Sequence, residues 1–132
     1  MSEQPTKIAI VEDDLAIVEM YRAKFEHEGY AVQTAGDGQS GLELFDTFKP
    51  DIVLLDLMMP EVTGFDVLSH LRQTSTSHPF KVIVLTNMGD TETATRVYKM
   101  AADDFIVKAE STPKEVVERV QTLLGKKSPN AA

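Results

Sequence analysis

The sequence of 132 residues contains no cysteine. Disulfide bonds, thiolate metal sites and cysteine nucleophiles are therefore excluded, so any chemistry depends on other side chains. No hydrophobic run approaches the length of a membrane span, and residues 1–5 have neither the basic nor the apolar segment of a secretory signal. We therefore expect a soluble cytoplasmic protein that does not enter a membrane.

Basic residues are in the minority. The 13 lysines and arginines stand against 21 aspartates and glutamates, which gives a net charge of −8. Such a surface argues against direct binding of nucleic-acid phosphates and favours cations or basic protein partners. With 42% hydrophobic and 26% charged residues, the chain has the composition of a folded protein, and its length suits a single domain.

Five short apolar segments alternate with amphipathic segments along the chain. The apolar segments are typical of strands and occupy residues 7–11, 31–35, 52–55, 81–85 and 105–107. Between and after them, apolar residues recur at helical spacing, and the last helix begins with a capping box at 112–115. Five consecutive βα units predict an α/β fold with a doubly wound, five-stranded parallel sheet.

Charged and hydroxyl side chains stand where the predicted strands end. In chain order they are Glu12, Asp13, Asp56, Thr86 and Lys108. Taken alone, each of them except Asp56 fits an ordinary surface or loop position. Because doubly wound folds bind ligands at the carboxyl ends of their strands, we expect these five side chains to share one site.

Asp56 is the most informative of these residues, because it follows four apolar residues on a strand without a polar face. Crowded carboxylates repel one another, and a hard divalent cation such as Mg²⁺ relieves the repulsion. A carboxylate can also act as a nucleophile and form an acyl phosphate. Phosphoryl transfer needs an acceptor, a cation and nearby positive charge, which Asp56, the acidic pair before it and Lys108 would provide.

Four segments carry a resemblance to a known family. They are VEDD at 11–14, LLDLMMP at 54–60, VIVLT at 82–86 and DDFIVK at 103–108. Together with their spacing, they resemble the receiver domain of bacterial two-component response regulators, of the stand-alone chemotaxis-regulator type. The resemblance extends over nearly the whole chain and implies a flavodoxin-like fold with strand order 2-1-3-4-5.

The resemblance implies a metal site around a phosphoacceptor. Asp56 would be the phosphoacceptor. Asp13 and Asp56 would ligate Mg²⁺ directly, together with the backbone carbonyl of Met58. Glu12 would act mainly through water.

The resemblance also implies a switch. Thr86 and Lys108 would contact the phosphoryl group, and Phe105 matches an aromatic position that changes rotamer with Thr86. The surface around residues 91–124 would then change and bind a downstream protein. The implied phosphoryl donor is a sensor histidine kinase or a phosphotransfer protein. The chain would be a monomer or a phosphorylation-dependent dimer. It would serve as a phosphoacceptor rather than as a turnover enzyme.

We expect the receiver domain to cover residues 7–125, between an N-terminal tail at 1–6 and a flexible C-terminal tail at 126–132. Since few residues remain outside this domain, the chain is either a stand-alone regulator or a receiver from a longer regulator or hybrid kinase.

The family usually has proline after the lysine, often with a cis bond. Here Ala109 follows Lys108, which leaves the geometry of that peptide open.

Two methionines predict a long-lived acyl phosphate. Met58 stands two residues after Asp56, and Met88 stands two residues after Thr86. In the family, these positions tune hydrolysis of the acyl phosphate. Because a thioether is only a weak hydrogen-bond acceptor, it positions an attacking water poorly, and we expect slow self-dephosphorylation.

Two other functions are less favoured alternatives. Residues 36–41 match GxGxxG after a predicted strand, which is typical of dinucleotide binding. However, Asp37 would repel a pyrophosphate, and this strand is expected at the sheet edge. A phosphatase of the haloacid dehalogenase type also forms an aspartyl phosphate, but it needs a second aspartate where this chain has Met58.

Overall fold

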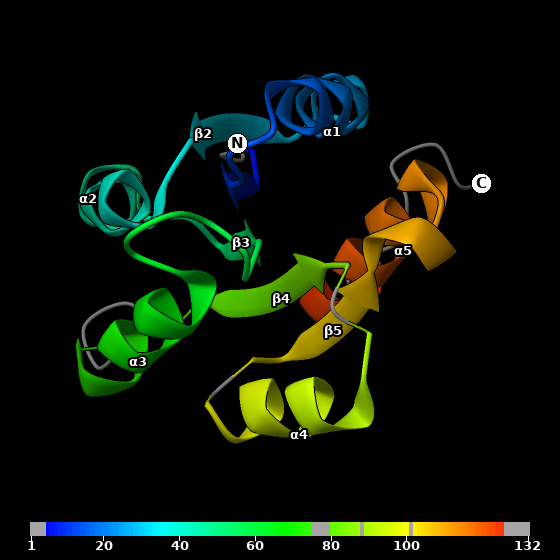
Figure 1. Ribbon diagram of the computed structural model, residues 1–132. Helices are drawn as coiled ribbons and strands as arrows, with labels where there is room; N and C mark the ends of the chain where they lie inside the picture. Colours follow the sequence, from blue (N-terminus) through cyan, green and yellow to red (C-terminus); the bar gives the residue numbers. More distant parts are fainter. Residues whose placement is uncertain (1–4, 75–79, 88, 101, 126–132) are drawn as a thin grey trace.

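The computed structural model describes residues 5–74, 80–87, 89–100 and 102–125. Its strands are β1 (Lys7–Val11), β2 (Ala31–Ala35), β3 (Ile52–Leu55), β4 (Lys81–Thr86) and β5 (Asp104–Val107). Its helices are α1 (Leu15–His27), α2 (Gly38–Phe48), α3 (Gly64–Thr74), α4 (Thr91–Lys99), the short 3-10 helix η2 (Lys108–Glu110) and α5 (Pro113–Leu124). The predicted alternation of strands and helices is confirmed (Figure 1). No helix in these ranges has both the length and the apolar character that a bilayer crossing requires.

The strands form one parallel sheet in the order β2-β1-β3-β4-β5. β1 pairs with β2 on one side and with β3 on the other, so the order of the strands switches between β1 and β3. This confirms the predicted doubly wound, flavodoxin-like sheet. In such folds, ligands bind at the carboxyl ends of the strands beside the switch.

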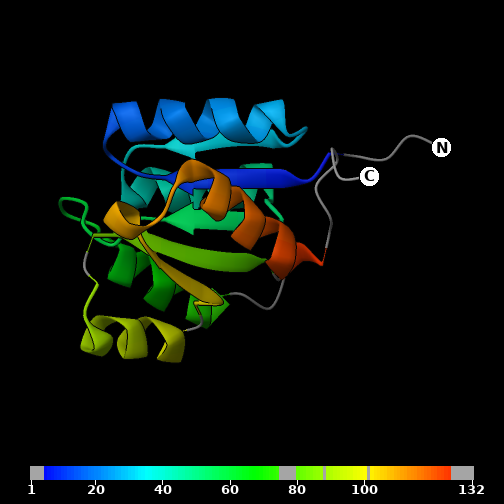
Figure 2. The ribbon, with the colours of Figure 1, turned by 90° about the vertical axis from the view of Figure 1, so that its right-hand side faces the viewer.

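Each face of the sheet has its own hydrophobic core, and helices cover both faces (Figure 2). On one face, Phe25 of α1 and Val116 of α5 pack over the strands. On the other face, Leu71 of α3 and Val97 of α4 do so. All residues of β3 are at most 1% exposed, as expected for a central parallel strand. Asp56 therefore follows a strand that is buried along its whole length.

Side chains cap the helices that begin near the carboxyl edge of the sheet. Asp14 accepts hydrogen bonds from the N–H groups of Ala16 at 3.0 Å and Ile17 at 3.3 Å. Thr112 and Glu115 form the predicted capping box at the start of α5. These caps satisfy backbone N–H groups in the first turn of each helix.

The start of α3 lies against the end of β3. The N–H of Gly64 donates to the carbonyl of Leu57 at 3.0 Å. A Cβ atom at Gly64 would lie 2.4 Å from the carbonyl oxygen of Asp56. Since backbone atoms occupy that space, this position requires glycine.

Candidate functional site

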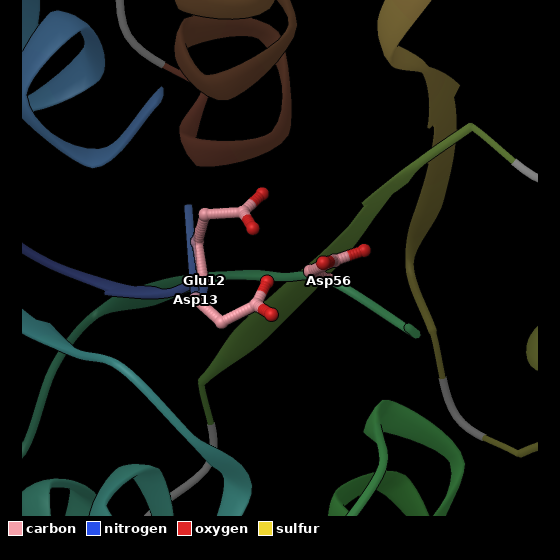
Figure 3. A group of neighbouring side chains, drawn as sticks. All are labelled: Glu12, Asp13 and Asp56. Atoms are coloured by element: carbon pink, nitrogen blue, oxygen red, sulfur yellow. The ribbon is translucent and has the colours of Figure 1, made fainter. Parts of the chain in front are cut away.

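Three carboxylates meet at the carboxyl edge of the sheet, beside the switch in strand order (Figure 3). Glu12 and Asp13 follow β1, and Asp56 follows β3. Each offers one oxygen atom, and these atoms all lie within 4.8 Å of one another. Glu12 is 4% exposed and Asp56 is 5% exposed, whereas Asp13 is exposed. The group is therefore buried at its base and open to solvent at Asp13.

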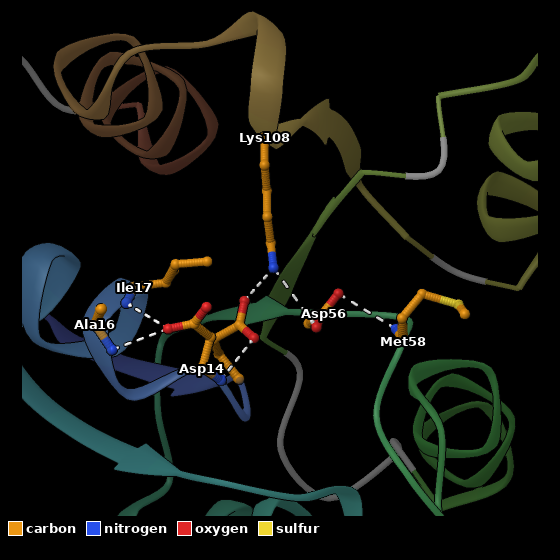
Figure 4. A network of polar contacts seen from close by, with 7 residues as sticks. Asp14, Ala16, Ile17, Asp56, Met58 and Lys108 are labelled. Carbon is orange, nitrogen blue, oxygen red and sulfur yellow. Dashed lines mark hydrogen bonds and ion pairs between the residues drawn. The ribbon is translucent and has the colours of Figure 1, made fainter.

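Lys108 reaches this group from the end of β5 (Figure 4). Its ammonium pairs with the carboxylate of Glu12 and lies 3.5 Å from Oδ2 of Asp56. The side chain is largely buried, and η2 begins at this residue. The described residues contain no cis peptide bond, so the bond between Lys108 and Ala109 is trans. The end of β5 and the η2 turn thus direct the lysine toward Asp56.

Backbone N–H groups orient the two buried carboxylates. The N–H of Met58 donates to Oδ1 of Asp56 at 3.2 Å, and the N–H of Asp14 donates to Oε2 of Glu12 at 3.1 Å. Figure 4 shows both contacts. Our sequence interpretation missed them, because residue types do not reveal where a backbone N–H points.

The two methionines after Asp56 differ in exposure. Met58 is 60% exposed, whereas Met59 is 4% exposed. Met58 therefore lies at the surface beside the acceptor, while Met59 belongs to the core under α3. Met88, the predicted counterpart of Met58, lies outside the described residues.

Thr86 and Phe105 lie on adjacent strands. Thr86 is fully buried at the end of β4. Phe105 on β5 is partly buried and pairs with Val84, two residues before Thr86. Because side chains two residues apart share a face of a sheet, Phe105 and Thr86 lie on the same face as diagonal neighbours.

Burial raises the pKa of Glu12 to about 7. The hydrogen bond from Lys108 and the one from the Asp14 N–H oppose this shift, while the nearby charge of Asp56 adds to it. The rise in the pKa of Glu12 caused by burial is thus larger than the lowering caused by these two hydrogen bonds. Without a cation, Glu12 holds a proton at pH values where an exposed glutamate is ionised.

We expect the unfolding free energy of the metal-free protein to fall as the pH rises from about 4.5 to about 7. The folded pKa of Glu12 lies above its usual value of 4.5, so protonation favours the folded state. This contribution is fully present below pH 4.5, is lost as the pH rises through 7, and is on the order of 3 kcal/mol. Urea unfolding in EDTA between about pH 5 and pH 8 measures it. The Glu12→Gln variant should show a shallower pH dependence, and equal slopes would contradict the assignment.

The residues present fit a hard divalent cation. Mg²⁺ prefers carboxylate and carbonyl oxygens and usually retains several waters. Glu12, Asp13 and Asp56 offer such oxygens within a small space, and the exposed side leaves room for water. A cation there would also relieve the repulsion among the buried carboxylates. With Lys108 opposite, the arrangement can hold a cation and balance the charge of a phosphoryl group.

Two of the three glycines of the GxGxxG segment, Gly38 and Gly41, have packing roles. A Cβ atom at Gly38 would lie 2.4 Å from the carbonyl oxygen of Val62, and one at Gly41 would lie 3.0 Å from the side chain of Val11. α2 therefore needs these glycines to pack against the loop after β3 and against β1. Packing accounts for Gly38 and Gly41 without a dinucleotide.

Comparison with known sequences identifies relatives. Residues 8–121 match the family described as "Response regulator receiver domain". The "Probable transcriptional regulator ycf27" of Guillardia theta is 36% identical over 122 residues, which are 92% of this chain and 46% of the relative. The "Alkaline phosphatase synthesis transcriptional regulatory protein PhoP" of Bacillus subtilis is 36% identical over 118 residues, which are 89% of this chain and 48% of the relative. The chain thus spans about half the length of the curated relatives it matches.

Solved structures show the same similarity. The receiver domain of Francisella response regulator 1452 has a TM-score of 0.83 and 31% identity, and the match covers 91% of this chain and 97% of that one. A CheY-like response regulator receiver domain protein from Methanospirillum hungatei has a TM-score of 0.84 and 25% identity, with 92% and 95% covered. The chain belongs to the response regulator receiver domains, which serve phosphorylation-dependent signalling in two-component systems.

Proposed function

We propose that this chain is a signalling switch in which Asp56 accepts a phosphoryl group from a sensor histidine kinase or a phosphotransfer protein. The main support is the position of the Asp56 carboxylate, which lies at the end of the central strand beside an acidic pair and 3.5 Å from the Lys108 ammonium. Membership of the receiver family supports the same chemistry.

Each residue would have a defined role in the transfer. An oxygen of Asp56 attacks the phosphorus of a phosphohistidine as the P–N bond breaks, and the released imidazole takes a proton from solvent. Lys108 balances the charge of the phosphoryl oxygens, and the hydroxyl of Thr86 donates a hydrogen bond to one of them. The Met58 N–H holds one Asp56 oxygen in place, which reduces the cost of orienting the nucleophile.

Mg²⁺ is the cofactor that we propose for this site. Asp13 and Asp56 would bind it directly with the backbone carbonyl of Met58, and Glu12 would bind through water. When bound, the ion neutralises charge on the phosphoryl oxygens. The proposal is supported by the three carboxylate oxygens that converge within 4.8 Å.

Thr86 and Phe105 would carry the signal away from Asp56. A phosphoryl group draws the Thr86 hydroxyl toward it, and Phe105 follows because the two side chains share a face of the sheet. The surface formed by α4, β5 and α5, within residues 91–124, then changes. Moving such an equilibrium from 1:99 to 99:1 requires about 5.5 kcal/mol of differential binding, and partial switching requires less.

Beryllofluoride with Mg²⁺ is expected to change the amide spectrum over α4, β5 and α5 as well as at the site, because it imitates the phosphoryl group on Asp56. The Thr86→Val variant keeps the branched shape without the hydroxyl, so its changes should stay near Asp56. Two-dimensional amide spectra of both proteins test this. If the parent protein responds only in the loops around residues 12, 56 and 86, the proposed switch is wrong.

We further propose that the chain is a phosphoacceptor with slow self-dephosphorylation rather than a turnover enzyme. The exposed thioether of Met58 beside Asp56 orients water poorly.

Met58→Asn combined with Met88→Glu is expected to speed loss of phosphate about three- to tenfold, because polar groups can position the attacking water. Decay after removal of the donor, with Mg²⁺ present, measures the rate. Met20→Gln is the matched control, since Met20 is 43% exposed on α1. A double variant that decays no faster than the parent would show that the methionines do not limit hydrolysis.

The proposed output is contact with a downstream protein, without direct binding of nucleic acid by this domain, as a monomer or a phosphorylation-dependent dimer. The proposed unit is 7–125, with tails at 1–6 and 126–132, of which residues 1–4 and 126–132 lie outside the described residues. A second candidate is the receiver part of a longer regulator. The half-length match favours it, as does a relative named "DNA-binding dual master transcriptional regulator RpaA" from Synechocystis. The mass of the full-length protein from its native source distinguishes the two.

A further inference from the structure

We propose that Arg96 of α4 and Phe65 of α3 form a clasp that holds α4 in its resting position and thereby opposes phosphoryl capture at Asp56. The guanidinium carbon of Arg96 lies 3.9 Å from the centroid of the Phe65 ring. This distance is typical of a cation–π contact. The inference rests on the proposed function and adds a regulatory contact to it.

The Phe65 end of the clasp is anchored to the acceptor. Phe65 follows Gly64, whose N–H is bonded to the Leu57 carbonyl and whose missing Cβ lets α3 touch the Asp56 carbonyl. The ring itself packs against the core on this face of the sheet. The Arg96 guanidinium, which lies over this ring, is therefore linked through the start of α3 to the backbone of Asp56.

The Arg96 end of the clasp lies on α4, which the proposed switch must move. Thr93 and Val97 are the residues of α4 that are buried against the domain, whereas Arg96 is exposed. Among the described residues, no carboxylate lies within 4.0 Å of the Arg96 guanidinium. Its contact in this part of the chain is with the Phe65 ring. The clasp therefore adds a contact to α4 beyond its small buried surface.

The clasp has a predictable effect on capture at Asp56. It is made where the two oxygens of the Asp56 carboxylate face the Met58 N–H at 3.2 Å and the Lys108 ammonium at 3.5 Å, and we assign it to the resting conformation on that ground. A displacement of α4 relative to α3 would separate the two side chains. A contact made in only one of two states shifts the equilibrium by its own free energy. Because exposed cation–π contacts are modest, loss of the clasp should favour the captured state about two- to fivefold.

Titration with beryllofluoride at saturating Mg²⁺ tests the clasp. Phe65→Leu and Arg96→Gln should each lower the concentration needed for half-maximal amide change by about two- to fivefold. The double variant should differ little from either single variant, since both remove the same contact. Phe65→Tyr and Arg96→Lys keep a ring and a cation and should stay closer to the parent. Lys99→Gln removes the same charge from an exposed position of the same helix and should behave like the parent.

Three results would overturn the clasp while leaving the proposed function intact: unchanged single variants, effects that multiply in the double variant, or equal effects of Lys99→Gln and Arg96→Gln. A general loss of stability cannot imitate the expected result, because it would weaken beryllofluoride binding rather than strengthen it. If the parent does not bind beryllofluoride, as Asp56→Asn should not, the proposed function fails and the clasp fails with it.

Discussion

Asp56→Asn is expected to abolish Mg²⁺-dependent phosphorylation of the protein. The amide has nearly the shape of the carboxylate but lacks its charge and its nucleophilic oxygen, so it cannot form an acyl phosphate. Incubation with acetyl phosphate or phosphoramidate, followed by intact mass measurement, detects the label on the parent. Treatment with hydroxylamine should remove it, because an acyl phosphate is cleaved by this nucleophile.

Asp51→Asn is a matched control for this experiment. Asp51 directly precedes β3, at the opposite end from Asp56, and its carboxylate accepts a hydrogen bond from the Lys7 N–H at 2.8 Å. The substitution removes the same charge far from the site and should leave the labelling intact. Equal labelling of Asp56→Asn, or labelling of the parent in EDTA, would falsify the assignment of the acceptor and its cation.

Gly64→Ala is expected to lower the free energy of unfolding by about 1–3 kcal/mol, which is the range typical of an overpacked interior. The added Cβ would lie 2.4 Å from the carbonyl oxygen of Asp56 and 2.6 Å from Cα of Leu57. These are backbone atoms, so relief requires a shift of α3 or of the acceptor itself. Urea unfolding measures the loss, and phosphorylation should slow because Asp56 is displaced.

Gly36→Ala is the control for this substitution. No atom lies within 4 Å of a Cβ at Gly36, and its φ is outside the left-handed region. The change should alter stability by less than about 0.5 kcal/mol or increase it slightly by restricting the unfolded chain. If both glycines respond alike, the close approach of α3 to the acceptor is not the cause.

The sequence was sufficient for the fold because its signals are local. The run Ile52–Leu55 is apolar at each position, which is how a strand covered on both faces appears in a sequence. The capping box at 112–115 marked the start of the last helix, and the structure has Thr112 and Glu115 in those roles. With the rule that parallel strands end at one edge, this local information also led us to expect Asp56 and Lys108 together.

A motif by itself was less informative. The GxGxxG segment has the residues of a dinucleotide site, but a glycine is required wherever any backbone comes close. Only the folded chain shows that Val62 lies close to Gly38 and that Val11 lies close to Gly41.

The sequence by itself determined the order of strands and helices, the buried central strand and the residue types gathered at its end. The tertiary structure alone decided the hydrogen bond from Met58 to Asp56, the direction of Lys108, the close contact at Gly64 and the position of Arg96 over Phe65. The physical reason is that strand and helix formation depends on neighbours along the chain. The direction of a backbone N–H and the packing of two helices depend on segments that meet only after folding.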